Sequence, residues 1–432
     1  MSDEATVRVQ RASALERQFW VGEQIAPSAR ANRALALIRA DGPVEHDALG
    51  AALSAVAARH EALRTAFVVE RGELWRKVLP PRDVPPPLHL PAGTGSHDAT
   101  AALLADDSLD LAAGRVFRAG VASDDTGATV YLAVHHIAFD GMSQEIFAAD
   151  LARAYALAVT GEDPVLPVRE RAEPAALAPG QRAELATHWR TMLDGAADLP
   201  LPGSAAGPGP GQRQLAQAEL TEESRELPAA IWQAVRARAR HSGCSPYAVL
   251  LAALGRALAE LTGGAGFCVG TPVAARTAAQ SDEIGYLTNT LPVRMPELSG
   301  PGAVERVWGA LRESVIGSAL PCGEIIRAAR TASGRRMPVY QALFAFENWE
   351  RAEHAAGPVR IRALPVPPVG GHAEIQLQVT ELPAGTLHCV AQAPLSSPWQ
   401  GRSAALLRAF DDELRLLCAD DATRPLGQEN TV

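Results

Sequence analysis

The sequence lacks the features that mark membrane and secreted proteins. No apolar run approaches the roughly 20 residues that a membrane-spanning helix requires. The N-terminus, Met1–Glu4, is acidic and is followed by mixed polar residues, without the basic and apolar regions of a signal peptide. We therefore expect a cytoplasmic protein that has no membrane partner.

The sequence also contains few cysteines and fewer basic than acidic residues. The five cysteines are scattered and form no Cys-x-x-Cys pair. This pattern argues against a disulfide framework and a zinc site, and it favours buried structural thiols over a catalytic one. The formal net charge of -9 argues against nucleic acid as a partner, because phosphate neutralisation requires a basic face.

Length and composition are those of a folded chain with two domains. The 432 residues are too many for one ordinary core. Hydrophobic residues make up 47% and charged residues 21%, which is typical of a globular protein. A proline-rich stretch over residues 163–181 is the expected crossover. We predict an N-terminal lobe over residues 1–176 and a C-terminal lobe over residues 177–432.

Hydrophobic periodicity predicts an α/β or α+β fold with mixed helices and strands in both lobes. A strand over residues 129–134 runs directly into a double histidine, and a helical pattern follows over residues 141–161. Residues 199–211 are rich in proline and glycine and are expected to form an exposed loop. The other predicted helices are 47–60, 231–240, 246–261 and 401–419, and the other predicted strands are 65–69, 266–271, 290–294, 339–347, 375–381 and 386–393.

The strongest chemical signal is the segment His135–Gly141 (HHIAFDG) at the end of a predicted strand. A histidine such as His136 is suited to accept or hold the proton of an attacking amine or hydroxyl near neutral pH. Asp140 is expected to turn back and brace the loop, or to pair with a distant arginine. Gly141 would permit a tight turn and leave a backbone N–H near the start of the next helix for a developing oxyanion.

Two other interpretations of this segment stay open on the residues alone. The histidines could be structural, because a histidine at a strand end is often only hydrogen-bonded. His135, His136 and Asp140 could also bind a metal ion. Adjacent residues of a strand point to opposite faces, however, so both histidines would not readily bind one ion.

Five further segments accompany the heptad in a fixed order. They are residues 13–20 (SALERQFW), 59–67 (RHEALRTAF), 270–276 (GTPVAAR), 284–294 (IGYLTNTLPVR) and 341–348 (QALFAFEN). Together with the heptad they resemble the motifs of the condensation domains of nonribosomal peptide synthetases. The resemblance covers nearly the whole chain and favours the catalytic interpretation of His136.

The resemblance implies the fold of chloramphenicol acetyltransferase-like enzymes, with two similar lobes in a V-shaped pseudo-dimer and a tunnel between them. His136 would be the catalytic residue and face this tunnel. His135 would point away and hold the loop, and Asp140 would form a structural salt bridge with Arg276. Asn348 matches a position on the acceptor side. Arg276 could instead be a solvated surface charge, and Asn348 a turn residue.

The chain departs from the family pattern at three places. Residues 320–324 (LPCGE) replace a His-x-x-x-Pro motif and lack its histidine, and residues 372–375 (HAEI) replace a common Asp-Leu pair. Both changes leave the acceptor preference open. The chain also runs from Met1 to Val432 without an adenylation or carrier module, which indicates a freestanding condensation enzyme.

The resemblance implies transfer of an acyl or aminoacyl group from the phosphopantetheine thioester of an acyl or peptidyl carrier protein. The acceptor would be an amine or alcohol, on a small molecule or a second carrier, and the product an amide or ester in natural-product biosynthesis. No metal and no bound cofactor are expected. Carrier docking calls for a basic patch, and the densest basic cluster, which could also be a solvated helix end, is Arg327, Arg330, Arg335 and Arg336.

Three other functions stay open beside this one. An epimerisation domain shares the heptad. A polyketide-associated O-acyltransferase of the same superfamily would use free alcohols. A catalytically degenerate member would only recruit carrier-bound intermediates, and the intact heptad counts against it.

Overall fold

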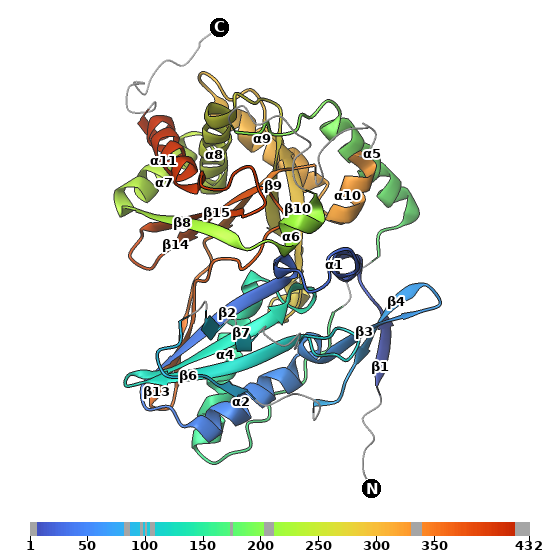
Figure 1. Cartoon of the computed structure of the whole chain (residues 1–432), viewed down its shortest axis with the longest axis vertical. Helices are drawn as coiled ribbons and strands as arrows, with labels where there is room; N and C mark the ends of the chain where they lie inside the picture. The colour runs from blue at the N-terminus through green and yellow to red at the C-terminus, as the bar shows by residue number, and fades with distance from the viewer. Residues whose placement is uncertain are drawn as a thin grey trace. The chain divides into compact units, whose positions relative to one another are not determined.

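The computed structural model describes residues 7–81, 87–95, 98–99, 102–103, 109–172, 176–202, 211–329 and 339–419. The chain divides into two compact units (Figure 1). Unit 1 comprises Met1–Ala176, Ala274–Thr288 and Trp349–Gly370, and unit 2 comprises Leu177–Val273, Asn289–Asn348 and Gly371–Val432. The first division falls at the predicted lobe boundary, but two later segments of the chain pack within unit 1.

Unit 1 is built on a six-stranded sheet with the order β12-β13-β2-β7-β6-β5, and a smaller sheet has the order β1-β4-β3. Neighbouring strands of the large sheet are antiparallel except β5 and β6, which are parallel. The elements are β1 Arg8–Arg11, α1 Ala14–Ile25, η1 Arg30–Asn32, β2 Arg33–Asp41, α2 His46–Arg59, η2 Glu61–Arg64, β3 Thr65–Glu70, β4 Glu73–Val78, β5 Leu88–His89, β6 Phe117–Asp124, β7 Gly127–His135, η4 His136–Ala138, α4 Gly141–Val159, η5 Ala278–Gln280, β12 Glu353–Ala356 and β13 Val359–Leu364.

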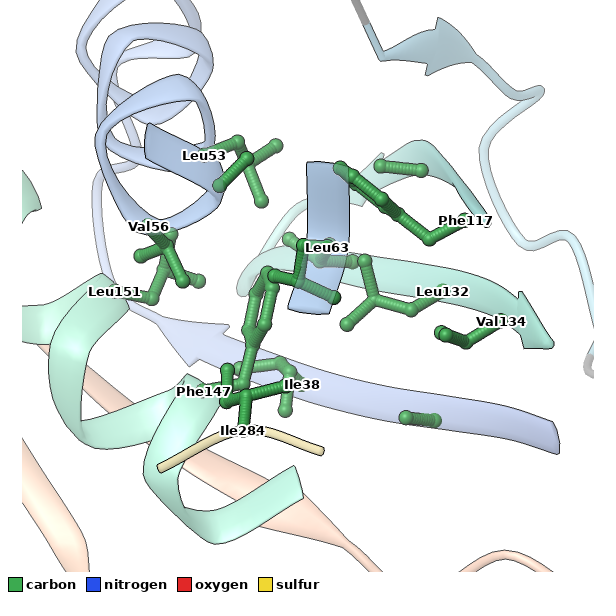
Figure 2. Close-up of a cluster of buried hydrophobic side chains, with 14 of the residues drawn as sticks. Ile38, Leu53, Val56, Leu63, Phe117, Leu132, Val134, Phe147, Leu151 and Ile284 are labelled. Atoms are coloured by element: carbon green, nitrogen blue, oxygen red, sulfur yellow. The ribbon is translucent and has the colours of Figure 1, made fainter. Parts of the chain in front are cut away.

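The core of unit 1 lies between this sheet and helices α2 and α4. Alternate residues of β7 point into it, as expected for a strand whose side chains alternate between faces. Ile284, from the later segment Ala274–Thr288, is buried in the same core. Figure 2 shows the side chains that meet there: Ile38, Leu53, Val56, Leu63, Phe117, Leu132, Val134, Phe147, Leu151 and Ile284.

The later segments join unit 1 for identifiable reasons. Burial of Ile284 removes an apolar side chain from water, which favours packing of Ala274–Thr288 on this unit. Strand β13 pairs with the edge of β2, and β12 pairs with β13, so Trp349–Gly370 extends the sheet. The contributions of these segments could not be read from hydrophobic periodicity, because they depend on pairing between distant parts of the chain.

Unit 2 is built on a mixed six-stranded sheet with the order β10-β9-β11-β14-β15-β8. Strands β9, β11 and β14 are parallel, whereas β14, β15 and β8 are antiparallel. Its elements are α5 Pro179–Leu193, α6 Gln212–Gln217, β8 Leu220–Leu227, α7 Ala229–His241, α8 Pro246–Thr262, β9 Cys268–Ala274, β10 Thr288–Arg294, α9 Ala303–Ile316, α10 Cys322–Ala329, β11 Ala342–Glu347, β14 Ile375–Glu381, β15 Leu387–Pro394 and α11 Ser403–Ala419.

Helices α7, α8, α9 and α11 form the core of unit 2 with this sheet. Helix α8 is buried along most of its length, as its nearly continuous apolar sequence predicts. Ser245 caps its first turn, Pro246 begins it, and Gly263 ends it with φ 68°, a left-handed conformation that favours glycine. The predicted α/β fold class is confirmed.

Among the described residues, no single helix is long and apolar enough to cross a membrane. Of the described helices, only α7 and α8 taken together reach the required length and apolar composition, and they are bent by 106° relative to each other. Three sequence predictions fall partly outside the described residues. They are the crossover at 163–181, of which 173–175 are not described, the loop at 199–211, of which 203–210 are not described, and the basic cluster, of which Arg330, Arg335 and Arg336 are not described.

Candidate active site

The heptad forms a short bridge between the central strand of unit 1 and its longest helix. Strand β7 ends at His135, residues His136–Ala138 make one 3-10 turn, and α4 begins at Gly141. Ile137, Ala138 and Phe139 are buried in the core. These apolar side chains anchor the segment in the core, while His136, which directly precedes them, stays half-buried.

The ring of His136 is oriented by its own loop. Its Nδ1 lies 3.2 Å from the carbonyl oxygen of Phe139. A carbonyl oxygen only accepts hydrogen bonds, so Nδ1 of the neutral imidazole carries the proton and donates it. Nε2 of His136 then bears the lone pair, which makes it the nitrogen that can accept a proton.

Two aromatic rings flank His136. Phe19 of α1 stacks on it at 5.8 Å between ring centroids with an interplanar angle of 28°. Tyr286 meets it edge-on at 6.3 Å and 79°, and Phe19 and Tyr286 contact each other at 4.4 Å. These contacts hold the plane of the imidazole, because offset-stacked and edge-on arrangements are the favoured aromatic geometries.

His135 is buried and points to different partners. Its Nδ1 accepts a hydrogen bond of 3.1 Å from the backbone N–H of Ile137. Its proton is therefore on Nε2, which lies 3.3 Å from Oε2 of Glu23. Burial lowers the pKa of His135 more than the Glu23 carboxylate raises it. His135 thus stays neutral at pH 7 and holds the loop in the opposite tautomer to His136.

Its hydrogen bonds keep the Glu23 carboxylate ionised, so that it acts as a hydrogen-bond acceptor. Burial alone would raise its pKa, but hydrogen bonds from His135, Asn32 and the backbone N–H of Ser28 outweigh burial and lower it. Asn32 donates at 2.7 Å and Ser28 at 2.6 Å. An ionised Glu23 therefore accepts from three donors and fixes the outer side of His135.

Asp140 is the N-cap of α4 and the anchor of the segment Ala274–Thr288. Its Oδ1 accepts from the backbone N–H of Ser143 at 2.9 Å and from the Ser143 hydroxyl at 2.7 Å. Its Oδ2 accepts from the backbone N–H of Leu287 at 3.0 Å. One carboxylate thus satisfies an open donor of the helix terminus and ties in the later segment.

Arg276 completes this anchor. Its Nη2 lies 3.1 Å and 3.2 Å from the two carboxylate oxygens of Asp140. Its Nη1 donates to the carbonyl oxygens of Gln280, at 2.6 Å, and Glu283. The two side chains of the pair are only 9% and 4% exposed, so Arg276 is not a solvated surface charge.

Gly141 occupies its position for a different reason from the expected tight turn. It is the first residue of α4 and does not have the left-handed backbone that requires glycine. A Cβ at this position would lie 3.0 Å from Cη2 of Trp349, which begins the segment Trp349–Gly370. The indole nitrogen of Trp349 also donates to Glu145 at 3.3 Å, one turn along the helix. Glycine therefore makes room for Trp349.

The structure brings together five of the six residues that the sequence singles out. His135, His136, Asp140, Gly141 and Arg276 all belong to unit 1. Asn348, which directly follows β11, is exposed and belongs to unit 2.

The sequence did not identify the side chains around the heptad: Phe19, Glu23, Tyr286 and Trp349. Phe19 and Tyr286 lie inside the recognised segments 13–20 and 284–294, so the motifs located them without indicating which member meets His136. The contact of Phe19 with His136 joins residues 117 positions apart, a separation that no local pattern encodes.

The described residues indicate neither a metal centre nor a nucleophilic role for Cys322 or Cys389. Within the described ranges, no group of three or more His, Cys, Asp or Glu side chains is arranged to hold a metal ion. Burial raises the pKa of Cys322, in the departing segment 320–324, to about 12, and that of Cys389 to about 12. Both thiols therefore stay protonated, and the thiolate is the form that attacks.

A model of the condensation domain matches residues 9–376. The chain belongs to the condensation domain family. Among curated proteins, phosphinothricin tripeptide synthetase PhsC of Streptomyces viridochromogenes is 30% identical over 365 residues, which are 77% of this chain and 32% of the synthetase. The condensation domain thus spans about a third of that relative's length.

Solved structures share the fold of this condensation domain. The condensation domain from the Monacolin K polyketide synthase MokA matches with a TM-score of 0.79 at 18% identity, over 96% of this chain and 98% of that one. The X-domain from teicoplanin biosynthesis, solved in complex with OxyB, matches with a TM-score of 0.73 at 23% identity, over 98% and 96%. The resemblance noted from the motifs is confirmed at the level of family and fold.

Proposed function

We propose that this condensation domain transfers an acyl or aminoacyl group from a carrier-protein phosphopantetheine thioester to an amine or alcohol acceptor. His136 is the catalytic residue. The observation that carries the proposal is the hydrogen bond from Nδ1 of His136 to Phe139, which leaves Nε2 as the proton-accepting nitrogen. Membership of the family supports acyl transfer that forms an amide.

The chemistry is balanced without a metal or a bound cofactor. The acceptor nitrogen or oxygen attacks the thioester carbonyl, and Nε2 of His136 accepts or orients the proton that the nucleophile loses. The C–S bond breaks as the C–N or C–O bond forms, and the carrier thiol takes up a proton as it leaves. For a neutral primary amine, orientation by His136 suffices, whereas an alcohol needs its proton removed.

The remaining residues act as supports in this proposal. His135 and Asp140 fix the two ends of the loop, and Arg276 neutralises Asp140. The backbone N–H of Gly141 lies in the first turn of α4, where helix amides are open to an oxyanion. Asn348 stays a prediction for acceptor binding, as do the freestanding arrangement and the cytoplasmic location.

Mass spectrometry of the carrier and the small-molecule products tests the proposal. The protein is incubated with acyl-loaded and aminoacyl-loaded carriers and a panel of amines and alcohols, and wild type is compared with His136→Ala. Removal of His89, an exposed histidine of β5, serves as the control for loss of an imidazole. Amide or ester formed by wild type and His89→Ala but not by His136→Ala is the expected result. Equal product from all three would contradict the proposal.

One solved structure of similar fold favours a second function. The X-domain from teicoplanin biosynthesis was solved in complex with another protein, OxyB, so a domain of this fold can bind a partner protein. On this alternative, the chain binds loaded carriers without turnover. Carrier binding by both wild type and His136→Ala, with no product from either, would support recruitment over catalysis.

A further inference from the structure

One face of the unit 2 sheet is lined by polar side chains although it is buried. Along β14, Ile375, Leu377 and Val379 point into the helical core. The alternating residues Gln376, Gln378 and Thr380 therefore point to the opposite face, and each is at most 7% exposed. Buried polar groups are normally hydrogen-bonded, so each of them requires a partner.

The neighbours of Gln378 on this face have their partners. Nε2 of Gln376 donates to Oε1 of Gln392 at 2.6 Å, and Nε2 of Gln392 donates to Glu222 at 2.7 Å. On the other side, the Thr380 hydroxyl lies 3.4 Å from Oε2 of Glu347. The polar side chains on both sides of Gln378 are thus hydrogen-bonded to side chains of neighbouring strands.

Gln378 differs from these neighbours. Within the described part of the chain, its side-chain amide makes no hydrogen bond. Its cross-strand neighbours are Ala345 on β11 and Val390 on β15, which have no polar group to offer. None of its polar atoms is fully sealed, so small molecules as large as water reach the amide. The result is a neutral donor and acceptor, 7% exposed, that lies between the apolar residues Ala345 and Val390.

We propose that Gln378 binds a secondary amide group of a ligand on this face of the unit 2 sheet. A carboxamide offers one N–H donor side and one C=O acceptor side, and a secondary amide is its complement. An anion would meet the carboxylates of Glu222 and Glu347 in the flanking rows, and any charged group would lose hydration there. Ala345 and Val390 suit the methylene groups on either side of an amide.

Two ligands of the proposed reaction carry this chemistry, and here the inference rests on the proposed function. The phosphopantetheine arm contains secondary amides, and so does a peptidyl substrate. Pantetheine and N-acetylalanine methylamide represent the two sources as probes. Binding does not involve His136 chemistry, so a failure of the catalytic proposal leaves this inference separately testable.

Stability measurements separate ligand binding from a structural role. Gln378→Leu removes an amide that bonds to nothing in the described chain, so the Tm is expected to stay unchanged or rise. Gln376→Leu is the matched control, since it deprives the buried Gln392 of a donor and is expected to lower the Tm. A fall in Tm for Gln378→Leu as large as that for Gln376→Leu would overturn the proposal.

Calorimetric titration of the full chain with each probe completes the test. Gln378→Leu is expected to raise the Kd of at least one probe by about tenfold, the loss of one buried hydrogen bond to a ligand. A change for pantetheine alone identifies the carrier arm, and a change for the methylamide alone identifies the substrate. Equal Kd values in wild type and variant for both probes, or no measurable binding of either probe to wild type, would overturn the proposal.

Discussion

Nδ1 of His136 lies 3.2 Å from the carbonyl oxygen of Phe139, while Nδ1 of the adjacent His135 accepts from the N–H of Ile137 at 3.1 Å. Two consecutive histidines therefore carry their protons on opposite nitrogens. His136 presents Nε2 as an acceptor, and His135 uses its Nε2–H to donate to Glu23. In the proposed mechanism the same residue type serves both reaction and support, because the backbone groups around each ring differ.

This assignment predicts two distinct nitrogen spectra. With 15N-labelled histidine at pH 8, His136 should show the Nδ1–H form and His135 the Nε2–H form. His136→Ala and His135→Gln variants assign the signals by loss of one set each. Nε2–H signals for both residues would contradict the tautomers inferred from the loop.

The buried pair Asp140–Arg276 should matter to folding more than its surface counterparts. Arg276→Ala leaves the Asp140 carboxylate buried without its cation, and the free energy of unfolding is expected to fall by about 3–5 kcal/mol. Urea denaturation measures this change. Arg360→Ala is the matched control, since it breaks an exposed pair with Glu353 and should change stability by less than about 1 kcal/mol. Equal losses for both variants would show that burial of the pair has no consequence.

Adding even a methyl group at Gly141 should lower the stability of the protein. Gly141→Ala puts a Cβ about 3 Å from the Trp349 ring and is expected to destabilise by about 1–3 kcal/mol through overpacking. In a Trp349→Leu background the smaller side chain removes this contact, so the cost of Gly141→Ala should shrink. Thermal unfolding of the four proteins gives the coupling between the two sites. Additive losses would mean that Trp349 is not the cause.

The rings beside His136 should act on rate through orientation. Tyr286→Phe keeps the edge-on ring and is expected to retain activity, whereas Tyr286→Ala frees the imidazole and should lower kcat more than it changes KM. Rates with a competent donor and acceptor measure both parameters. A loss of kcat in Tyr286→Phe equal to that in Tyr286→Ala would assign the effect to the hydroxyl instead.

The pH dependence of stability follows from buried histidines. Burial lowers the pKa of both His135 and His60, more than hydrogen bonds to Glu23 and Asp150 raise them. Below about pH 6.5 the unfolded chain therefore binds more protons than the folded chain does. Because of this difference, the free energy of unfolding falls as pH decreases. Glu23, whose pKa is lowered, adds a further loss at more acid pH, below about 4.5.

Replacing one of these histidines should flatten this dependence. His135→Gln keeps a donor toward Glu23 but cannot titrate, so the slope between pH 6.5 and 5 should decrease by up to about 1.4 kcal/mol per pH unit, with His60 supplying the remainder. Urea unfolding at pH 7.5, 6 and 5 checks the slope. An unchanged slope would mean that His135 does not titrate differently in the folded and unfolded chains.

The sequence predicted part of the helices and strands, namely those whose patterns are local and clear. The helix expected over 246–261 is α8 Pro246–Thr262, and the strand expected over 129–134 is the middle of β7 Gly127–His135. Strand β2, Arg33–Asp41, was not predicted, although it lies at the centre of the unit 1 sheet. Its residues Arg39 and Asp41 pair with Asp124 and Arg362 from distant segments, and these charged residues obscured the apolar pattern of the strand.

The heptad itself could be found from sequence, but the surroundings that orient it could not. The motif marks His136, yet the tautomer depends on the Phe139 carbonyl turning back by three residues. The ring plane depends on Phe19 and Tyr286, which come from the first and second chain segments of unit 1. Such contacts are set by tertiary packing, which one sequence does not specify residue by residue.

The single-turnover rate shows whether Nε2 of His136 takes part in acyl transfer. An acyl-loaded carrier and a competent acceptor are mixed with excess wild-type protein, His136→Ala or His89→Ala, and product is followed by mass spectrometry. We expect the rate to fall by about 10²–10⁴-fold for His136→Ala and to stay at the wild-type value for His89→Ala. A wild-type rate for His136→Ala would contradict this role.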